Sequence, residues 1–245
     1  MWFFLGLSFL TGLMGCEGES PISQDTPAPE IVGLQVTPAV EHWLPIVAEC
    51  AGGIPNFGVY TQVLPQSDLS LAESDLILRL GERLESEPFV AIMGVEEIVI
   101  IAGEDVPVLS LSLDNLRAIY TGKLTLWGEV VDVANGGSVI GQPIHPLSYP
   151  EGHEVEIQFR RAYLADELMQ VNPQEFLTVP FLEDLLVRYP YAISYLLRSQ
   201  VPEDVRVIEI VSDETIANQQ YVLAVTDQEP TGGLKQLLLC LQNAE

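Results

Sequence analysis

The segment from Leu111 to Trp127 reads LSLDNLRAIYTGKLTLW, and it carries three structural signals in order. Ser112 stands at the start of a helix-forming stretch, in the position of an N-cap. Gly122 is placed to end that helix, because glycine tolerates the backbone conformation common at helix C-termini. Trp127 follows as a large apolar anchor. The segment therefore predicts a short capped helix that is fixed to a core by an aromatic side chain.

Strand-like and helix-like segments alternate on both sides of this stretch, which is typical of the α/β class. The predicted strands are 31–36, 57–64, 76–78, 88–102 as two segments interrupted at Gly94, 144–148, 191–196, 205–211 and 221–225. The other predicted helices are 37–51, 152–164, 181–188 and 233–242. The first of them has Thr37 as N-cap and Pro38 at its first position, with a bend at Pro45.

The composition indicates a folded, strongly acidic protein. The chain has 245 residues, of which 48% are hydrophobic and 18% charged, enough for one large or two small domains. Its formal net charge is −25. Such a charge repels nucleic acid and leaves no basic patch for an acidic lipid surface, so we expect no nucleic-acid partner.

The N-terminus has the features of an export signal. Residues 1–16 read MWFFLGLSFLTGLMGC, an uncharged apolar run too short to span a bilayer. Its end, Leu13 to Cys16, resembles the bacterial lipobox, in which the cysteine becomes lipid-modified. We therefore predict a lipoprotein signal peptide over 1–16, lipid on Cys16, a flexible tether over 17–30, and an exported, lipid-anchored protein that is periplasmic or at the cell surface. No Lys or Arg precedes the apolar run, so the usual basic n-region is missing, and the alternative is a plain secretory signal or an expression artefact.

Two further cysteines, Cys50 and Cys240, remain if Cys16 is acylated. An exported location permits a disulfide between them. A pair of buried free thiols is the alternative, since cysteine is among the most buried residue types.

The segment 112–127 resembles a conserved element of the phosphate-binding family of solute-binding proteins, which has the form "sLt.dqLr.If.GkitnW". Residues 73–76 (ESDL), 191–195 (YAISY) and 221–223 (YVL) are similar to three more of its elements, "aDia", "gAIgY" and "YPL". The resemblance covers roughly residues 31–245. It implies a periplasmic-binding-protein type 2 fold, in which two α/β lobes enclose a ligand cleft and close by hinge bending.

The same resemblance implies an organisation and partners. Lobe 1 would consist of 30–95 plus 220–245, and lobe 2 of 96–219. The helices that carry Cys50 and Cys240 would then both belong to lobe 1, so a disulfide is predicted. The implied protein is a monomer without cofactor or enzymatic activity, and it delivers a small polar solute or oxyanion to an ABC permease.

Three predicted ligand-binding residues lie in the N-terminal part of the chain. Thr37 falls where the family has its first anion-binding hydroxyl, Ser67 lies on the loop of the second, and Asp75 takes the position of the cleft carboxylate. Thr37 could instead be a helix cap without a ligand, and Asp75 could pair with Arg79.

The third binding element departs from the family pattern. Where the family has Arg-x-x-Gly-Ser-Gly-Thr, residues 149–155 read YPEGHEV, which places Tyr149 and His153 in the site and brings Glu151, Glu154 and Glu156 near it. Each lost charge-assisted hydrogen bond is worth about 1.5–3 kcal/mol. The sequence therefore predicts a diverged anion site with weak or absent phosphate binding.

Other functions have less support from the sequence. His145, His153 and nearby carboxylates match no established metal-ligand spacing, so no metal is predicted. No catalytic triad or Gly-rich phosphate loop is evident. The leading hypothesis is a lipid-anchored solute-binding protein of an ABC importer. The alternative is a degenerate binding domain that acts as a sensor or protein-interaction module without transport.

Overall fold

The computed structural model describes residues 28–130, 141–165, 167–170 and 172–244. Cys16, the predicted signal peptide and most of the tether lie outside the described residues. The strands are β1 (Glu30–Val36), β2 (Phe57–Val63), β3 (Leu76–Leu80), β4 (Phe89–Ala102), β5 (Ser110–Ser112), β6 (His145–Ser148), β7 (Gln174–Glu175), β8 (Ala192–Leu197), β9 (Arg206–Val211) and β10 (Gln219–Thr226). The α-helices are α1 (Leu44–Gly52), α2 (Leu113–Tyr120), α3 (Glu154–Tyr163), α4 (Val179–Arg188) and α5 (Gly232–Leu241), and the 3-10 helices are η1 (Pro38–Trp43), η2 (Gln66–Asp68), η3 (Trp127–Glu129) and η4 (Arg198–Gln200).

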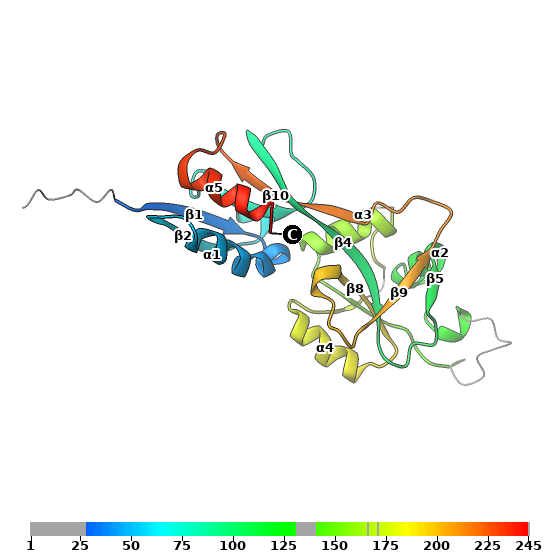
Figure 1. Ribbon diagram of the computed structural model, residues 1–245. Helices are drawn as coiled ribbons and strands as arrows, with labels where there is room; N and C mark the ends of the chain where they lie inside the picture. Colours follow the sequence, from blue (N-terminus) through cyan, green and yellow to red (C-terminus); the bar gives the residue numbers. More distant parts are fainter. Residues whose placement is uncertain (1–27, 131–140, 166, 171, 245) are drawn as a thin grey trace, which may run out of the picture.

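One strand, β4, belongs to both halves of the molecule. Its residues 89–97 pair antiparallel with β10, which continues through β3 and β1 to β2. Its residues 98–102 pair with β8, and 100–102 also pair with β9 on the other edge. Figure 1 shows β4 as a long ribbon between two bodies. We call the body with β1, β2, β3, β10, α1 and α5 the first lobe, and that with β5, β6, β8, β9 and α2–α4 the second lobe.

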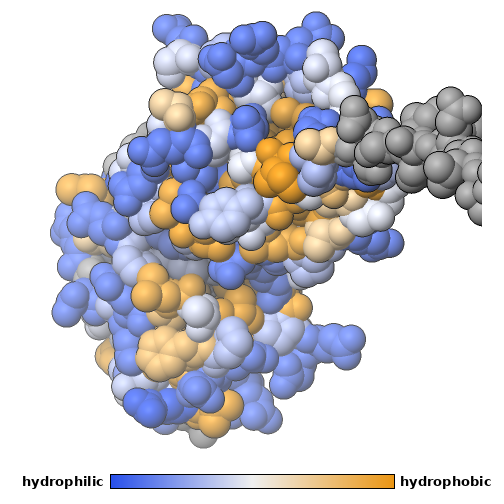
Figure 2. Space-filling model, turned by 90° about the vertical axis from the view of Figure 1, so that its left-hand side faces the viewer, coloured by the Kyte–Doolittle hydropathy of each residue, from blue (hydrophilic) through white to orange (hydrophobic). Residues whose placement is uncertain are grey.

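The core of the first lobe lies between its sheet and helices α1 and α5. Val32, Leu34 and Val36 of β1 alternate onto the buried face, and Trp43 and Leu237 are buried with them. Figure 2 shows hydrophilic residues spread over both lobes with apolar patches between them, as expected for a protein with such a high net charge.

The prediction of a single helix over 37–51 is wrong for the first half of this range. The chain forms the 3-10 helix η1 there, with a non-helical Val40 (φ −114°, ψ 15°), and the α-helix begins only at Leu44. Pro45 therefore lies in the first turn of α1, where its missing N–H has no helical partner to lose. It marks the start of α1 and does not bend a longer helix.

The prediction of two strand segments over 88–102 is also wrong. The chain forms one strand of 14 residues. Val222 pairs with Gly94 but Leu223 pairs with Ile92, so Met93 is an extra residue in β4. A β-bulge of this kind bends a strand without ending it, which explains how Gly94 can interrupt the pattern but not the strand.

The segment 111–127 is built into the second lobe as a structural unit. The Ser112 hydroxyl accepts a hydrogen bond from the Asn115 N–H (3.1 Å), and Gly122 has a φ of +74°. Trp127 is fully buried, and its Nε1 donates to the carbonyl of Tyr191 (3.0 Å). The segment thus contributes to the core of the second lobe.

A disulfide joins the two helices of the first lobe. Cys50 near the end of α1 and Cys240 near the end of α5 are bonded, with their Cα atoms 5.8 Å apart. No helix formed by the described residues is long and apolar enough to cross a membrane.

We predict that replacing both cysteines, as Cys50→Ala with Cys240→Ala, lowers the free energy of unfolding by up to roughly 5 kcal/mol, because the bridge closes a loop of 190 residues in the unfolded chain. Denaturant titration measures this. Thiol titration of the unfolded protein should also gain two thiols on reduction, and finding both thiols free beforehand would contradict the bridge.

Candidate functional site

Thr37 lies where the first lobe faces the second. It follows β1, its N–H donates to the Leu78 carbonyl of β3 (3.1 Å), and its carbonyl accepts from the Val40 N–H (3.1 Å). The residue is fully buried, and its hydroxyl has no hydrogen-bond partner among the described residues. Thr37 holds the predicted N-cap position, but its hydroxyl is not used to cap η1.

Glu154, the first residue of α3, brings a buried carboxylate to this point from the second lobe. Only 4% of its surface is exposed, and in the described part of the chain neither carboxylate oxygen has a hydrogen-bond partner. Burial raises the pKa of Glu154 from its ordinary value of 4.5 to about 7, although the nearby Thr37 side chain, Leu80 backbone and Arg79 charge oppose the rise. A buried carboxyl with few donors favours its protonated form.

Gln158, one turn further along α3, extends the same contact between lobes. A Cβ atom on Gly81, just after β3, would come within 2.8 Å of the Gln158 Nε2 atom. Gly81 also has a φ of +116°, which side chains rarely adopt. Helix α3 therefore packs closely against the end of β3 through Glu154 and Gln158.

Arg79 is a cation beside Glu154 whose donors are already engaged. Its guanidinium is 3% exposed and binds both carboxylate oxygens of Glu87 (2.7 and 2.8 Å), and it donates to the carbonyls of Leu80 and Glu82. A bidentate pair of this geometry is strong. Arg79 thus attracts Glu154 electrostatically without donating a hydrogen bond to it.

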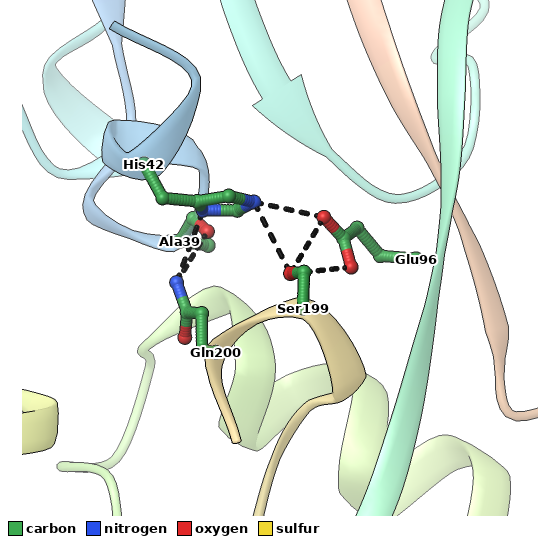
Figure 3. Close-up of polar contacts among 5 residues, drawn as sticks. All are labelled: Ala39, His42, Glu96, Ser199 and Gln200. Atoms are coloured by element: carbon green, nitrogen blue, oxygen red, sulfur yellow. Dashed lines mark hydrogen bonds and ion pairs between the residues drawn. The ribbon is translucent and has the colours of Figure 1, made fainter. Parts of the chain in front are cut away.

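A second contact between the lobes is a polar cluster formed by His42, Glu96, Ser199 and Gln200 (Figure 3). The His42 Nε2 atom lies 2.8 Å from Glu96 Oε1, and the Ser199 hydroxyl lies 3.0 and 2.8 Å from the two Glu96 oxygens. Gln200 Nε2 lies 3.0 Å from His42 Nδ1 and 3.4 Å from the Ala39 carbonyl. The cluster joins η1 of the first lobe to η4, across β4.

The contacts within this cluster assign its protons. Gln200 donates to His42 Nδ1, so the imidazole proton is on Nε2 and is donated to Glu96. Burial raises the pKa of Glu96, but hydrogen bonds from His42 and Ser199 outweigh this and hold it below its ordinary value. Glu96 is therefore an anion at neutral pH that is stabilised from both lobes.

The cluster contains the residue types of a catalytic triad but lacks its geometry. In a triad the acid binds one imidazole nitrogen and the serine the other. Here Glu96 and Ser199 both lie at Nε2, and Gln200 occupies Nδ1. The Ser199 proton goes to Glu96, so the imidazole does not activate this hydroxyl as a nucleophile.

The structure does not bring Ser67 and Asp75 to Thr37. Ser67 is exposed, and its hydroxyl donates to Asp68 (2.9 Å). The Asp75 carboxylate accepts from the Gly33 N–H (2.8 Å) at the start of β3. Gly33 and Thr37 are four residues apart on an extended strand, or about 13 Å.

Tyr149 and His153 lie just before α3 and pack into the second lobe. Their rings stack with centroids 4.2 Å apart, and Tyr149 also contacts Phe176. His153 is the N-cap of α3, with Nδ1 accepting from the Val155 N–H (3.3 Å). Burial lowers the pKa of His153 to about 4, so the side chain is neutral at pH 7 and brings no positive charge to an anion.

Three cavities among the described residues are not lined by Thr37 or Glu154. One, of about 540 Å³, is lined by residues that include Gly103, Leu186 and Arg206, and another, of about 250 Å³, by residues that include Tyr149, Glu151 and Glu156. Within the described ranges, no group of three or more His, Cys, Asp or Glu side chains could hold a metal ion. The lobes are thus in contact at Thr37, with the Glu154 side chain between them.

Comparison with known proteins identifies the fold. No protein-family model matches the sequence, and curated proteins give no match. An ABC-type phosphate transport receptor from Vibrio cholerae is 14% identical over 87% of this chain and 94% of its own, with a TM-score of 0.67. A putative phosphate ABC transporter substrate-binding protein with bound phosphate from Clostridium perfringens is 20% identical over 86% and 93%, with a TM-score of 0.67. The chain has the type 2 periplasmic-binding-protein fold.

This fold also occurs outside transport receptors. The regulatory domain of CcmR from Synechocystis PCC6803, in complex with 2-PG, is 12% identical over 88% of this chain and 97% of its own, with a TM-score of 0.62. The type 2 periplasmic-binding-protein fold expected from segment 112–127 is therefore confirmed. It does not by itself distinguish a transport receptor from a regulatory domain.

We predict that Glu154→Gln stabilises the protein at high pH. The folded-state pKa lies above the unfolded value, so the wild type loses stability as the pH rises from about 4.5 to 7, and the loss is complete above 7. At 1.36 kcal/mol per pH unit the difference between variant and wild type should approach roughly 3 kcal/mol at pH 8 and vanish below pH 4.5. Urea unfolding at the two pH values measures it, and a pH-independent difference would contradict the assignment.

We also predict that Ser199→Ala costs about 1–2 kcal/mol of unfolding free energy, because the partly buried Glu96 carboxylate loses the hydroxyl proton that its two oxygens share. Ser67→Ala is the matched control, since its exposed hydroxyl binds only Asp68, and it should change stability by less than about 0.5 kcal/mol. Equal effects of the two variants would show that the cluster does not hold the lobes together.

Proposed function

We propose that this protein is a lipid-anchored extracytoplasmic solute-binding protein that delivers a small polar solute to an ABC permease. The observation that supports it is the type 2 periplasmic-binding-protein fold, whose two lobes meet at Thr37 and Glu154 and are joined by the hydrogen bonds of His42 and Ser199 to Glu96. The proposed lobes are 30–95 plus 220–245 and 96–219. The proposed protein acts as a monomer and is not an enzyme.

The proposed ligand is not phosphate bound in the geometry of the phosphate-binding family. The position of the family's arginine is taken by Tyr149, which is stacked on a neutral His153. The nearby guanidinium of Arg79 is engaged by Glu87. With Glu154 also present, the cleft offers too few donors to compensate the desolvation of a multiply charged oxyanion.

The proposed anchor is lipid on Cys16. A receptor for a permease has to stay near the membrane, and the proposed tether is residues 17–30, whose three prolines and few apolar side chains are typical of a linker sequence.

A second candidate is a sensor or protein-interaction module that no longer transports a solute. The observation in its favour is that the Glu154 side chain fills the contact between the lobes. Regulatory domains such as that of CcmR have the same fold. A permease encoded beside this protein, or stimulation of a permease ATPase by it, would favour the receptor.

The experiment that tests the proposed function is a thermal-shift screen of phosphate, sulfate, molybdate, small organic acids and neutral or cationic polar solutes, on wild type and Thr37→Val. We expect one solute of the panel to raise the melting temperature of the wild type, since a ligand at 100 times its Kd adds about 2.7 kcal/mol to stability. Thr37→Val removes a buried hydroxyl at nearly constant volume, so it should fold and lose the shift.

Three outcomes would contradict parts of this proposal. Submicromolar phosphate binding by calorimetry would contradict the diverged site. A shift of equal size in Thr37→Val would place the ligand outside the cleft. No shift with any solute of the panel would favour the sensor or interaction module.

A further inference from the structure

Two buried oxygen-bearing groups approach each other between the lobes, close enough for the Thr37 hydroxyl to lower the pKa of Glu154 but without a well-formed hydrogen bond. The Thr37 hydroxyl comes from the first lobe and the Glu154 carboxylate from the second, and across the described chain none of their side-chain oxygens has a partner. An unpaired buried carboxylate costs several kcal/mol, so native proteins rarely keep one without a function. The pair lies at the contact between the two lobes, where the proposed function places the solute.

Glu154 has the chemistry of an anionic ligand. Its carboxylate is a planar pair of oxygens, delivered to the start of η1 and the end of β3 by the first turn of α3. The Gln158 and Gly81 contact holds α3 against β3 and so keeps Glu154 in place. The carboxylate differs from a free solute only in being covalently part of the second lobe.

We infer that Glu154 is a tethered occupant of the cleft: its protonated carboxyl lets the lobes close without a solute, and its ionised form favours opening. The role of Glu154 as an occupant of the solute position rests on the proposed receptor function. The closure of the lobes can be measured without any solute. It makes Glu154 the residue that determines which solutes the cleft accepts.

The sign of the pH dependence follows from burial. In the closed form the carboxylate is desolvated, and in the open form water hydrates it, so closure takes up a proton. Because burial raises the pKa of Glu154 to about 7 in the closed form, lowering the pH through 7 favours closure. An ionised Glu154 also repels an oxyanion, which would have to displace it.

The charged and titratable groups around Glu154 have partners of their own. On β3, η1 and β4 these pairs are Arg79 with Glu87, His42 with Glu96, and Glu97 with Arg198. On α2 and β8 they are Arg117 with Glu214 and Tyr195 with Ser148. On or beside α3 they are Glu156 with Arg160, and His153 with the Val155 N–H. Burial lowers the pKa of His153 to about 4, so it stays neutral between pH 5.5 and 8.5. His42 is the other imidazole near the cleft, and its contribution is separated by the variant His42→Gln.

The test is small-angle X-ray scattering of the full chain carrying Cys16→Ser, without added solute, between pH 5.5 and 8.5. We expect the radius of gyration to fall as the pH is lowered, with a midpoint near 7. Glu154→Gln, a neutral isostere, should stay closed at every pH. Glu151→Gln removes an equal charge from an exposed position three residues away and should titrate like the parent chain.

A radius of gyration that does not change with pH, or that changes equally in Glu154→Gln, would overturn the inference. Loss of the transition in His42→Gln, with Glu154 intact, would assign the switch to His42 and overturn it as well. Circular dichroism of each variant establishes that it is folded.

A second measurement uses Glu154→Ala, which vacates the place of the carboxylate. Calorimetry at pH 8 should show sulfate binding at least tenfold tighter than in the parent chain, and no gain would overturn the role of Glu154 as an occupant of the solute position. If closure titrates as expected and the solute screen of the wild type finds no ligand, the receptor function fails and the tethered occupant stands. If a solute binds but closure does not depend on pH, the receptor function stands and the tethered occupant fails.

Discussion

The continuity of β4 is the constraint on which the cleft depends. A strand places neighbouring side chains on opposite faces, so Glu96 and Glu97 point in opposite directions at the crossing between the lobes. Glu96 reaches His42 and Ser199, whereas Glu97 binds Arg198 and Asn218. Two adjacent carboxylates therefore form polar contacts on opposite faces of β4, at the point where it passes from one lobe to the other. The bulge at Met93 changes the local register without breaking the strand, so the lobes stay hydrogen-bonded to one backbone.

The electrostatics of the contact between the lobes oppose binding of a multiply charged oxyanion. The chain carries a formal charge of −25, the nearest arginine is neutralised by Glu87, and α3 begins with a glutamate where an oxyanion site needs donors. The positive end of the α3 dipole faces Glu154, but this favours the charged form by only about 0.3–1 kcal/mol at most helix ends. Burial has the larger effect, which is why the carboxyl is poised to change its protonation near neutral pH.

Much of the fold could be predicted because its signals are local. The helix cap is formed by Ser112, the helix stop by Gly122 and the aromatic anchor by Trp127, and each signal lies in the residue itself. The α/β alternation follows from apolar periodicity. The errors occurred where tertiary packing overrides such signals. After Thr37 the chain forms a 3-10 helix, because this places Ala39, Val40 and Trp43 in the core. At Gly94 the strand continues because its backbone pairs with β10.

The sequence by itself determined the fold class, the segment that anchors the second lobe, and the departure of residues 149–155 from the phosphate-binding pattern, because each resides in a contiguous run of side chains. It also predicted Thr37 as a site residue, through its resemblance to the first anion-binding hydroxyl of the phosphate-binding family. Only the tertiary structure brought Glu154 to Thr37, and both His42 and Ser199 to Glu96, from which they lie 54 and 103 residues away in the chain. No local pattern encodes such pairs. Whether a glutamate is an ordinary exposed charge or a buried, unpaired carboxyl is decided by what the other lobe places against it.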